Sequence, residues 1–264
     1  MKNKTGWRNR IIGLGLAAAA LSLGSAATLH AEDSAYMAPP KGFQVTWKRV
    51  IREGGRSSSG TLVHAVTSSK GDEVVYKVVE PGGDEVRLLR GIFSYAFWRP
   101  NQGWAEYKFD KEAIRGLWPL KVGKEAVVKM QFGFGLAKTE DAARKKWTHT
   151  ETGTIHYRVL RRENVTTLAG TFDAFVIQRD RTFTKHEDQT TDSHSRVAWF
   201  VPSLGYVVKQ IVIYKPGNPK SRRTTIEALR IVKPGIINRD KPRLWRLSWP
   251  GIRPEQSTTS DPTP

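Results

Sequence analysis

Short runs of apolar residues, several of them in imperfect alternation with polar ones, recur along this chain, and such runs are typical of β-strands. Between residues 153 and 232, five runs rich in Val, Ile, Thr, Phe, Tyr and Trp follow one another, which is the composition of strands. We predict strands at residues 154–162, 172–184, 194–201, 206–214 and 223–232. Only short connections separate these runs, so neighbouring strands are expected to pair antiparallel.

The connection between two of these strands has the signature of a tight turn. Pro202 fixes φ at its start, and Gly205 at its exit is free to adopt a positive φ. Several strands, such as residues 206–214, carry apolar residues on both faces. We therefore expect a curved sheet whose second face is partly covered.

The same hairpin pattern extends through the N-terminal half. We predict further strands at residues 43–49, 61–67, 73–80, 92–98, 104–110 and 125–136. Residues 52–60, rich in Gly and Ser, are expected to form a flexible hairpin loop. Residues 139–147 are the one helix candidate, because Thr139 can cap a helix that starts acidic and ends basic. The predicted fold is all-β: a single antiparallel, curved sheet or half-open barrel built from successive hairpins, with at most one short helix in the mature chain.

Three segments of this predicted sheet resemble a known family. They are AGTFDAFVI at residues 169–177, WFVPSLGYVVK at residues 199–209 and WPLKVGK at residues 118–124. The combination is similar to that of exported bacterial β-rich envelope proteins of unknown function, which carry AGTFxAFxI followed by WFxPxxGYVVK. The resemblance implies an envelope protein with an antiparallel, partly open sheet. It implies no catalytic residues, because its motifs lie at turns and core positions.

The two ends of the chain differ from its β-rich centre. Residues 1–31 combine a basic start, an apolar run and small residues, which predicts a signal peptide cleaved between Ala26 and Glu32. A transmembrane anchor is the alternative, but the apolar run is short and rich in small residues. We divide the chain into a signal peptide (1–31), a linker (32–42), an antiparallel β domain (43–232), a basic Trp-containing segment (233–254) and a disordered tail (255–264). The mature protein is expected to be soluble, without a transmembrane segment, in the periplasm or outside the cell.

The sequence contains few signs of catalytic chemistry. Cysteine is absent, which excludes disulfides, thiol nucleophiles and cysteine metal ligands. No G-x-S-x-G motif occurs, and no pair of carboxylates is marked, although distant carboxylates could meet in a cleft. His186, Asp188, Asp192 and His194 could bind a divalent cation, but a solvated polar loop explains them better. We expect no cofactor and no tightly bound metal, and a binding protein is favoured over an enzyme.

The charge of the chain indicates the class of partner. Lys and Arg number 43 against 25 Asp and Glu, which gives a formal net charge of +18 at pH 7. Such a charge favours anionic partners. In an envelope these are lipopolysaccharide, anionic lipid headgroups and the carboxylates of peptidoglycan, whereas export disfavours nucleic acid. The alternative is that the charge serves only solubility.

Tryptophans mark two candidate binding regions. Trp98, Trp104 and Trp118 could line a concave face of the sheet and hold an acyl chain or stack against sugars, although indoles are often core residues. The second region is the C-terminal segment, which mixes guanidinium groups and indoles that suit an anionic membrane interface: Arg243, Trp245, Arg246 and Trp249. The alternative is that this segment folds back and buries its indoles on the β domain.

These features favour an exported, soluble, non-catalytic envelope protein that binds an amphipathic or anionic envelope component, such as lipid, lipopolysaccharide or glycan. Two alternatives from other classes stay open. A hydrolase acting on envelope glycan or lipid would need a cleft with facing carboxylates or a His–Asp pair. A structural or assembly subunit would need a flat apolar patch for a protein partner.

Overall fold

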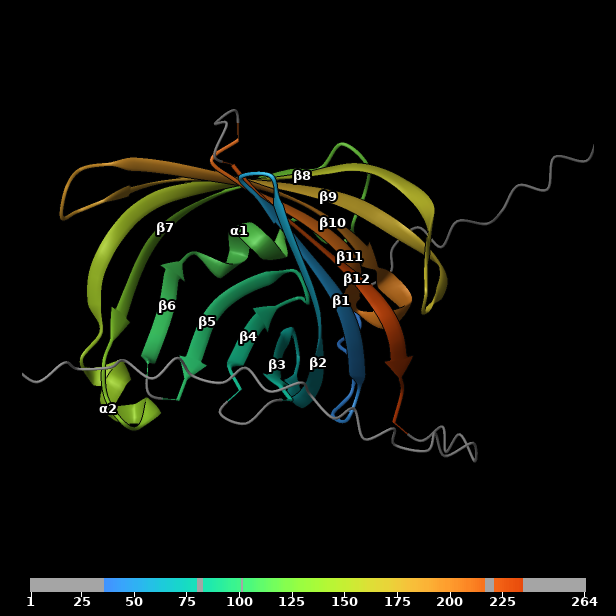
Figure 1. Cartoon of the computed structure of the whole chain (residues 1–264), viewed down its shortest axis with the longest axis horizontal. Helices are drawn as coiled ribbons and strands as arrows, with labels where there is room; N and C mark the ends of the chain where they lie inside the picture. The colour runs from blue at the N-terminus through green and yellow to red at the C-terminus, as the bar shows by residue number, and fades with distance from the viewer. Residues whose placement is uncertain (1–35, 80–82, 101, 217–220, 235–264) are drawn as a thin grey trace, which may run out of the picture. The chain divides into compact units, whose positions relative to one another are not determined.

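The computed structural model describes residues 36–79, 83–100, 102–216 and 221–234. These residues form twelve antiparallel strands in a single closed barrel (Figure 1). The strands are β1 (Gln44–Glu53), β2 (Arg56–Lys70), β3 (Glu73–Val78), β4 (Glu85–Leu89), β5 (Phe93–Arg99), β6 (Gly103–Phe109), β7 (Glu125–Gly135), β8 (Thr148–Thr167), β9 (Gly170–Lys185), β10 (Thr191–Val201), β11 (Tyr206–Tyr214) and β12 (Arg222–Val232). The predicted all-β fold of successive antiparallel hairpins is therefore confirmed.

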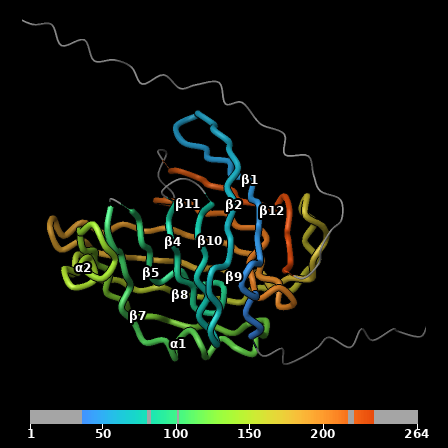
Figure 2. The backbone as a smooth tube through the Cα atoms, turned by 90° about the horizontal axis from the view of Figure 1, so that it is seen from below, coloured from blue at the N-terminus to red at the C-terminus, as the bar shows by residue number. Residues whose placement is uncertain are grey.

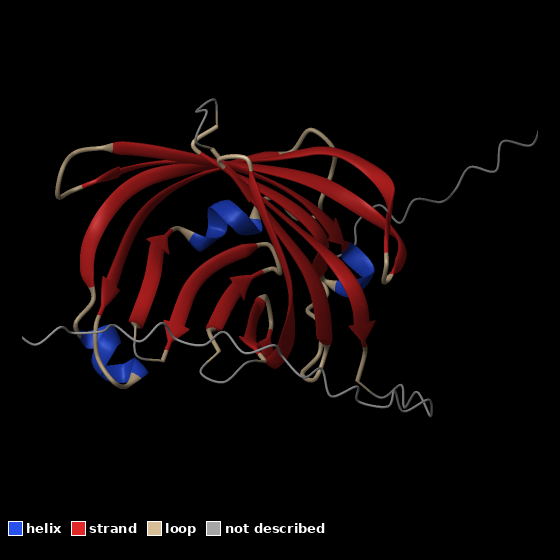
Figure 3. Cartoon of the chain, in the orientation of Figure 1, coloured by secondary structure: helices blue, strands red, loops and turns tan. Residues whose placement is uncertain are grey.

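Three short helices lie in the connections between these described strands (Figure 3). They are α1 (Lys111–Arg115) between β6 and β7, α2 (Glu140–Lys145) between β7 and β8, and the 3-10 turn η1 (Pro202–Leu204) between β10 and β11. The predicted helix at residues 139–147 is confirmed as α2, with Thr139 as its N-cap. Successive connections of an up-and-down barrel lie at opposite ends. We call the end that holds α1 and η1 the α1 end, and the opposite end, which holds α2, the α2 end (Figure 1).

Hydrophobic side chains fill the α1 end of the barrel. Ile114 and Leu117 are fully buried in a cluster shared with the barrel wall. Tyr36, which precedes the first strand, packs on Trp118 and Phe200, with ring centroids 5.8 Å and 6.5 Å away. Burial of apolar surface is the main favourable term in folding, so this end is a packed core rather than a passage.

The barrel differs from the predicted sheet in two details. Where the sequence pattern predicts a half-open barrel, β1 pairs along its whole length with both β12 and β2, and the sheet closes. Closure removes the exposed edge strands that a half-open sheet would present. The second detail is α1, which adds a helix to the predicted one. The Asp110 side chain caps α1, because its Oδ1 accepts a hydrogen bond from the Glu112 backbone N–H at 2.9 Å.

Two segments depart from the predicted pattern. The expectation of a flexible loop at residues 52–60 is wrong, because only Gly54 and Gly55 form the turn and both flanks are strand. Their φ values of 53° and 78° are those of a two-residue hairpin turn that favours glycine, and Figure 2 shows this β1–β2 hairpin extending beyond its neighbours. The second segment is β4, where the sequence pattern predicts no strand. A bulge before Leu88 leaves both Leu88 and Leu89 buried, which hides the strand period of two.

Other predictions concern residues that the structure does not describe. The signal peptide at residues 1–31 and the tail at residues 255–264 lie outside the described residues, as does the basic segment from residue 235 onward. Within the described chain, no helix has the length and apolar character needed to cross a membrane.

Candidate functional site

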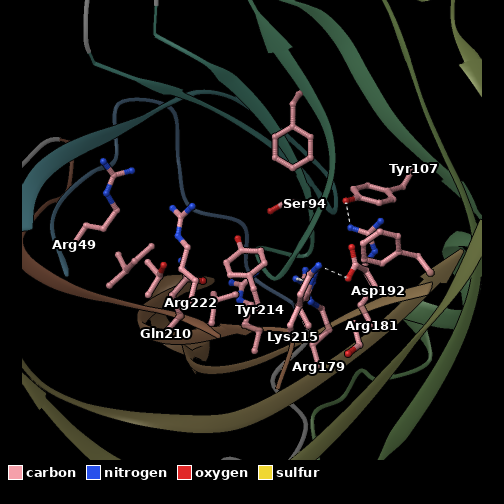
Figure 4. Close-up of a pocket in the computed structure, with 18 residues that line it drawn as sticks. Arg49, Ser94, Tyr107, Arg179, Arg181, Asp192, Gln210, Tyr214, Lys215 and Arg222 are labelled. Atoms are coloured by element: carbon pink, nitrogen blue, oxygen red, sulfur yellow. Dashed lines mark hydrogen bonds and ion pairs between the residues drawn. The ribbon is translucent and has the colours of Figure 1, made fainter. Parts of the chain in front are cut away.

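A cavity of about 490 Å³ lies inside the barrel (Figure 4). The positions of its lining residues along their strands place it in the half toward the α2 end. Strands β1, β5, β6 and β9 to β12 line it. Six of the lining side chains are basic: Arg49, Arg179, Arg181, Arg196, Lys215 and Arg222. Asp192 is the one carboxylate among the described lining residues, and apolar side chains such as Phe97 and Phe183 form much of the remaining wall. The cavity therefore combines an excess of positive charge with apolar surface.

The register of the strands sets the depth of each lining residue. Residues directly opposite one another on neighbouring strands form a rung across the wall, and every second rung faces the interior. Counted from the α2 end, the first inward rung holds Phe183 and Asp192. The second holds Arg181, His194, Tyr214 and Arg222, and the third holds Arg179, Arg196, Val212 and Thr224. The fourth includes Gln210, Ile226 and Arg49.

Carboxylates balance two of the basic groups, and Figure 4 shows one of these pairs, Lys215 with Asp192. Arg181 donates to Glu151 Oε2 at 2.7 Å and to the Tyr107 hydroxyl at 2.8 Å, and its side chain is only 9% exposed. Lys215 Nζ lies 3.1 Å from Asp192 Oδ1. Arg181 and Lys215 therefore have their counter-charges within the protein.

The third rung carries positive charge without such a counter-charge. Arg179 and Arg196 lie directly opposite each other on β9 and β10, and neither forms an ion pair with a carboxylate in the described part of the chain. The Nε atoms of both guanidinium groups are buried without a hydrogen-bond partner, as are Gln210 Oε1 and Thr224 Oγ1 in the same cavity. Like charges at directly opposite positions destabilise a sheet, and buried polar groups normally have partners. The third rung therefore carries positive charge and free hydrogen-bonding groups that no described carboxylate balances.

His194 holds Arg179 in position. Arg179 Nη2 donates to His194 Nε2 at 2.7 Å, and because arginine accepts no hydrogen bond, the imidazole is neutral with its proton on Nδ1. Burial, followed by the charges of Arg179, Arg181 and Arg196, lowers the pKa of His194 to about 3. Burial, followed by the charge of Arg179, lowers the pKa of Arg196 to about 10. Arg196 therefore stays charged at neutral pH, and the third rung presents two cations.

A smaller cavity of about 60 Å³ continues from the third rung toward the α1 end. It shares Ser94, Arg196 and Gln210 with the large cavity, and its other walls are largely aromatic: Trp47, His64, Tyr76 and Tyr206. His64 stacks on Tyr76 with ring centroids 4.2 Å apart, and burial lowers the pKa of His64 to about 3. Arg196 is therefore the only charged residue that lines the small cavity.

Two of the tryptophans predicted to contact a ligand lie on the outer side of the barrel wall. Trp98 and Trp104 are cross-strand partners on β5 and β6. Trp104 lies three positions from the inward-facing Tyr107, so it belongs to the opposite face. It is 1% exposed beneath α2, where the Arg144 guanidinium lies 3.9 Å from the centroid of its ring. This packing gives Trp104 a structural place beside α2.

The other predicted ligand contacts also do not line the cavities or lie outside the described residues. Trp118 packs against Phe200 at the α1 end, with ring centroids 5.8 Å apart. Trp98, Trp104 and Trp118 line neither cavity. Arg243, Trp245, Arg246 and Trp249 fall outside the part of the chain that the structure describes. A ligand contact by any of these residues stays a prediction.

The histidines of the polar hairpin between β9 and β10 are separated by the fold. The expectation of a solvated loop is wrong for His194, which is 9% exposed because β10 turns it inward. His186 is exposed in the turn and contacts His149, with ring centroids 4.1 Å apart. No group of three or more His, Cys, Asp or Glu side chains among the described residues could hold a metal ion.

The arginines of the third rung are not among the predicted site residues, although the sequence contains a signal for them. On β9, the alternate residues Phe175, Ile177, Arg179, Arg181 and Phe183 share one face. Two cations thus interrupt an otherwise apolar face, as Arg196 does on β10. Charged residues on the core face of a strand indicate a polar cavity or a buried ion pair, and the structure shows one of each.

Comparison with known proteins gives distant likenesses of fold only. The sequence matches no protein-family model and no curated protein. The hypothetical lipoprotein YmcC from Escherichia coli is 10% identical, with a TM-score of 0.41 over 70% of this chain and 84% of that one. A protein from Bacteroides fragilis, described as exported and of YmcC-like fold, is 14% identical, with a TM-score of 0.40 over 75% of this chain and 99% of that one. A DUF1329 family protein from Desulfovibrio piger is 11% identical, with a TM-score of 0.26 over 74% of this chain and 86% of that one. None of these likenesses bears on a ligand.

Proposed function

We propose that this chain is an exported envelope protein whose barrel binds an anionic, amphipathic envelope component without chemical conversion. The observation that carries this proposal is the Arg179–Arg196 pair, two facing cations with no ion-pair partner among the described residues. An anionic group between them would relieve their repulsion and satisfy their free N–H donors. A volume of about 490 Å³ is within the range of small-molecule sites.

The apolar walls support an amphipathic rather than a purely ionic ligand. Phe97, Phe183, Tyr214 and Ile226 line the same cavity as the cations. The cavity reaches the surface at the α2 end, where the Tyr214 residue is 43% exposed and the Lys215 side chain 59% exposed. A ligand that combined one anionic group with apolar surface would contact both kinds of wall. Lipids and the lipid portion of lipopolysaccharide have this composition.

The sequence supports an envelope location. Residues 1–31 have the succession of a signal peptide, and the net charge of +18 suits the anionic polymers and lipids of an envelope. On this proposal the mature protein is soluble and acts in the periplasm or outside the cell.

The lining of the cavity favours binding over hydrolysis. Hydrolysis of a glycan by a pair of carboxylates needs two acidic groups that face each other. In the part of the chain that the structure describes, Asp192 is the one carboxylate of the lining, and it is paired with Lys215. His194 is bonded to Arg179 rather than to a carboxylate. No second candidate function gains support from the described residues.

A titration with short-chain lipids tests the proposal. The mature chain would be titrated calorimetrically with dihexanoyl phosphatidylglycerol and dihexanoyl phosphatidylcholine, each below its micellar concentration. We expect the anionic lipid to bind and the zwitterionic lipid to bind more weakly. The double variant Arg179→Gln, Arg196→Gln should lose binding.

The control removes the same charge from the outer face. Lys48 and Lys129 are exposed on the outer side of β1 and β7, so Lys48→Gln with Lys129→Gln matches the net charge of the cavity variant. This control should bind the anionic lipid as the parent does. Equal losses of lipid affinity in both double variants would show that surface charge, not the cavity, attracts the lipid. An absence of binding by the parent would refute the proposal.

A further inference from the structure

We propose that the anionic group of the ligand is a phosphate ester, that it enters the barrel first, and that Arg179 and Arg196 hold it on the third rung while the rest of the ligand extends toward the α2 end. This inference rests on the proposed function and adds the chemical class and the orientation of the ligand. It follows from the number of free donors at the third rung, from the depth of that rung, and from what lies on either side of it.

The donors of the third rung suit a phosphate better than a carboxylate. One bidentate guanidinium group is enough to engage both oxygens of a carboxylate. A phosphate ester has more terminal oxygens in a tetrahedral arrangement, so two guanidinium groups can donate to it from different directions. Arg179 and Arg196 face each other with their Nε donors free, and His194 occupies only Nη2 of Arg179. The Thr224 hydroxyl on the same rung is a further donor without a partner.

The depth of the third rung sets the orientation. Beyond Arg196, the described residues enclose a cavity of about 60 Å³ that continues toward the α1 end, and this volume holds no more than a few water molecules. The remainder of the α1 end is packed with buried side chains. A ligand seated at Arg196 therefore cannot extend further inward, and its bulk must point toward the α2 end.

Apolar side chains line the path from the third rung to the surface. Phe183 lies on the first rung and Tyr214 on the second, and both belong to the cavity lining. Arg181 on the second rung is already bound to Glu151 and Tyr107. An alkyl or acyl chain attached to the phosphate would therefore pass aromatic surface on its way out.

The repulsion between Arg179 and Arg196 should be measurable in the stability of the protein without added ligand. Arg179 and Arg196 repel each other when no anion is present, so Arg196→Gln should leave the melting temperature unchanged or raise it. Arg181→Gln is the contrast from the same cavity. It removes the donor side of a buried ion pair and of a hydrogen bond, so its melting temperature should fall. A structural role for Arg196 would instead give the result of Arg181→Gln.

Calorimetric titration of the mature chain with octyl phosphate, octanoate and inorganic phosphate tests the chemical class. We expect octyl phosphate to bind at least about tenfold more tightly than either of the other two. Arg179→Gln and Arg196→Gln should each weaken octyl phosphate binding by at least about tenfold. Arg196→Lys keeps the charge but not the planar fork, so it should fold as the parent does and still bind octyl phosphate more weakly.

Each contrary outcome overturns a different part of the inference. Equal affinity for octanoate would refute the phosphate preference and leave the proposed anionic amphiphile standing. Equal affinity for inorganic phosphate would show that a free phosphate compound is the ligand and would refute the apolar path. Dodecyl phosphate should bind at least as tightly as octyl phosphate, because a longer chain leaves through the α2 end; weaker binding would place the chain in the closed α1 end. Failure of all of these anions to bind would refute the proposed function itself.

Discussion

At the scale of single residues, one step along β9 separates the packed core from the cavity. Ile177 faces inward and is buried in the hydrophobic cluster, and the next inward residue, Arg179, lines the cavity. A cation that replaces an apolar side chain at this depth needs a partner. Arg181 has such a partner in Glu151, whereas Arg179 interacts with the neutral side chains of His194 and Tyr157, neither of which is a counter-charge. Arg181 is therefore a structural residue of the barrel wall, whereas Arg179 is a candidate ligand contact.

Gly205 carries the first prediction. The expected positive φ is confirmed at 61°, and a Cβ at this position would lie 1.7 Å from the backbone oxygen of Met37. We expect Gly205→Val to lower the free energy of unfolding by at least about 1–3 kcal/mol, because backbone strain alone costs that much. Gly60→Val is the control, since Gly60 is exposed in β2 with no neighbouring atom within 4 Å of the new Cβ. It should change stability by no more than about 0.5 kcal/mol. Urea melts of both variants measure this difference in stability, and equal midpoints would contradict the prediction.

The buried histidines predict sensitivity to acid. His64 and His194 each have a pKa of about 3 in the folded protein, against an ordinary value of 6.5. The unfolded chain therefore binds more protons as the pH falls below about 6.5, and the free energy of unfolding decreases by about 1.4 kcal/mol per pH unit for each histidine. Above that pH the two groups contribute no pH dependence.

Urea melts between pH 7 and pH 5 measure this slope. His194→Gln keeps an acceptor for Arg179 but does not titrate, so it should remove about half of the slope. His186→Gln, which changes an exposed histidine in the β9–β10 turn, should keep the slope of the parent. Equal slopes in the parent and in His194→Gln would show that His194 is not the group responsible. The lowered pKa values of Asp72 and Glu73 place the effect of these carboxylates below this window.

At the scale of elements, α1 closes one end of the barrel, so the cavity opens to the surface toward the α2 end. Its Ile114 side chain is fully buried, whereas the Glu112 side chain is 71% exposed. We expect Ile114→Ala to lower the free energy of unfolding by about 2–5 kcal/mol, the usual cost of a large buried side chain. Glu112→Ala, which breaks only an exposed pair with Arg115, should cost less than about 1 kcal/mol. Similar melts for the two variants would mean that α1 is not part of the core.

Strands and turns were largely predictable from the sequence, because their signals are local. The strand predicted at residues 206–214 coincides with β11, and the turn before it ends at Gly205 as expected. The bulge at Leu88 conceals β4, because it breaks the alternation on which the prediction depends. Closure was not predictable in the same way, since the pairing of β1 with β12 joins the two ends of the β domain and leaves no local mark.

The candidate site depends on that non-local information. Arg179 and Arg196 are 17 positions apart in the numbering of the chain, and only the β9–β10 register makes them direct neighbours. Their depth follows from closure of the barrel and from the packing of α1. The sequence reveals that cations lie on an apolar face, but it does not reveal which of them lacks a carboxylate.

At the scale of the whole molecule, the positive charge is divided between two separate parts of the chain. The net charge of +18 predicted an anionic partner without saying where it binds. Some of the basic side chains line the cavity. Others, including Arg243 and Arg246, belong to the predicted C-terminal segment beyond the described residues. If both act, the segment attracts the protein to an anionic surface and the cavity binds a single molecule. The two roles can be separated by truncation.

A chain that ends at Pro234 is the whole-molecule test. It retains β12, which ends at Val232 and pairs with both β1 and β11, so we expect the stability of the parent and the parent's affinity for octyl phosphate. Binding to phosphatidylglycerol vesicles should weaken, because each cation near an anionic surface contributes about 1 kcal/mol. Co-sedimentation with phosphatidylglycerol and phosphatidylcholine vesicles at low and high salt measures this. Added salt should weaken the binding of the parent, because it screens exposed charges.

The double variant Arg179→Gln, Arg196→Gln completes the comparison. It should lose its binding of octyl phosphate and retain its binding to phosphatidylglycerol vesicles. Opposite losses in the two proteins would show that surface attraction and cavity binding are independent. If the truncated chain unfolds, the C-terminal segment belongs to the core and its indoles are structural. If it folds and binds vesicles as the parent does, the segment has no part in surface binding, and the attraction must come from the cations of the barrel itself.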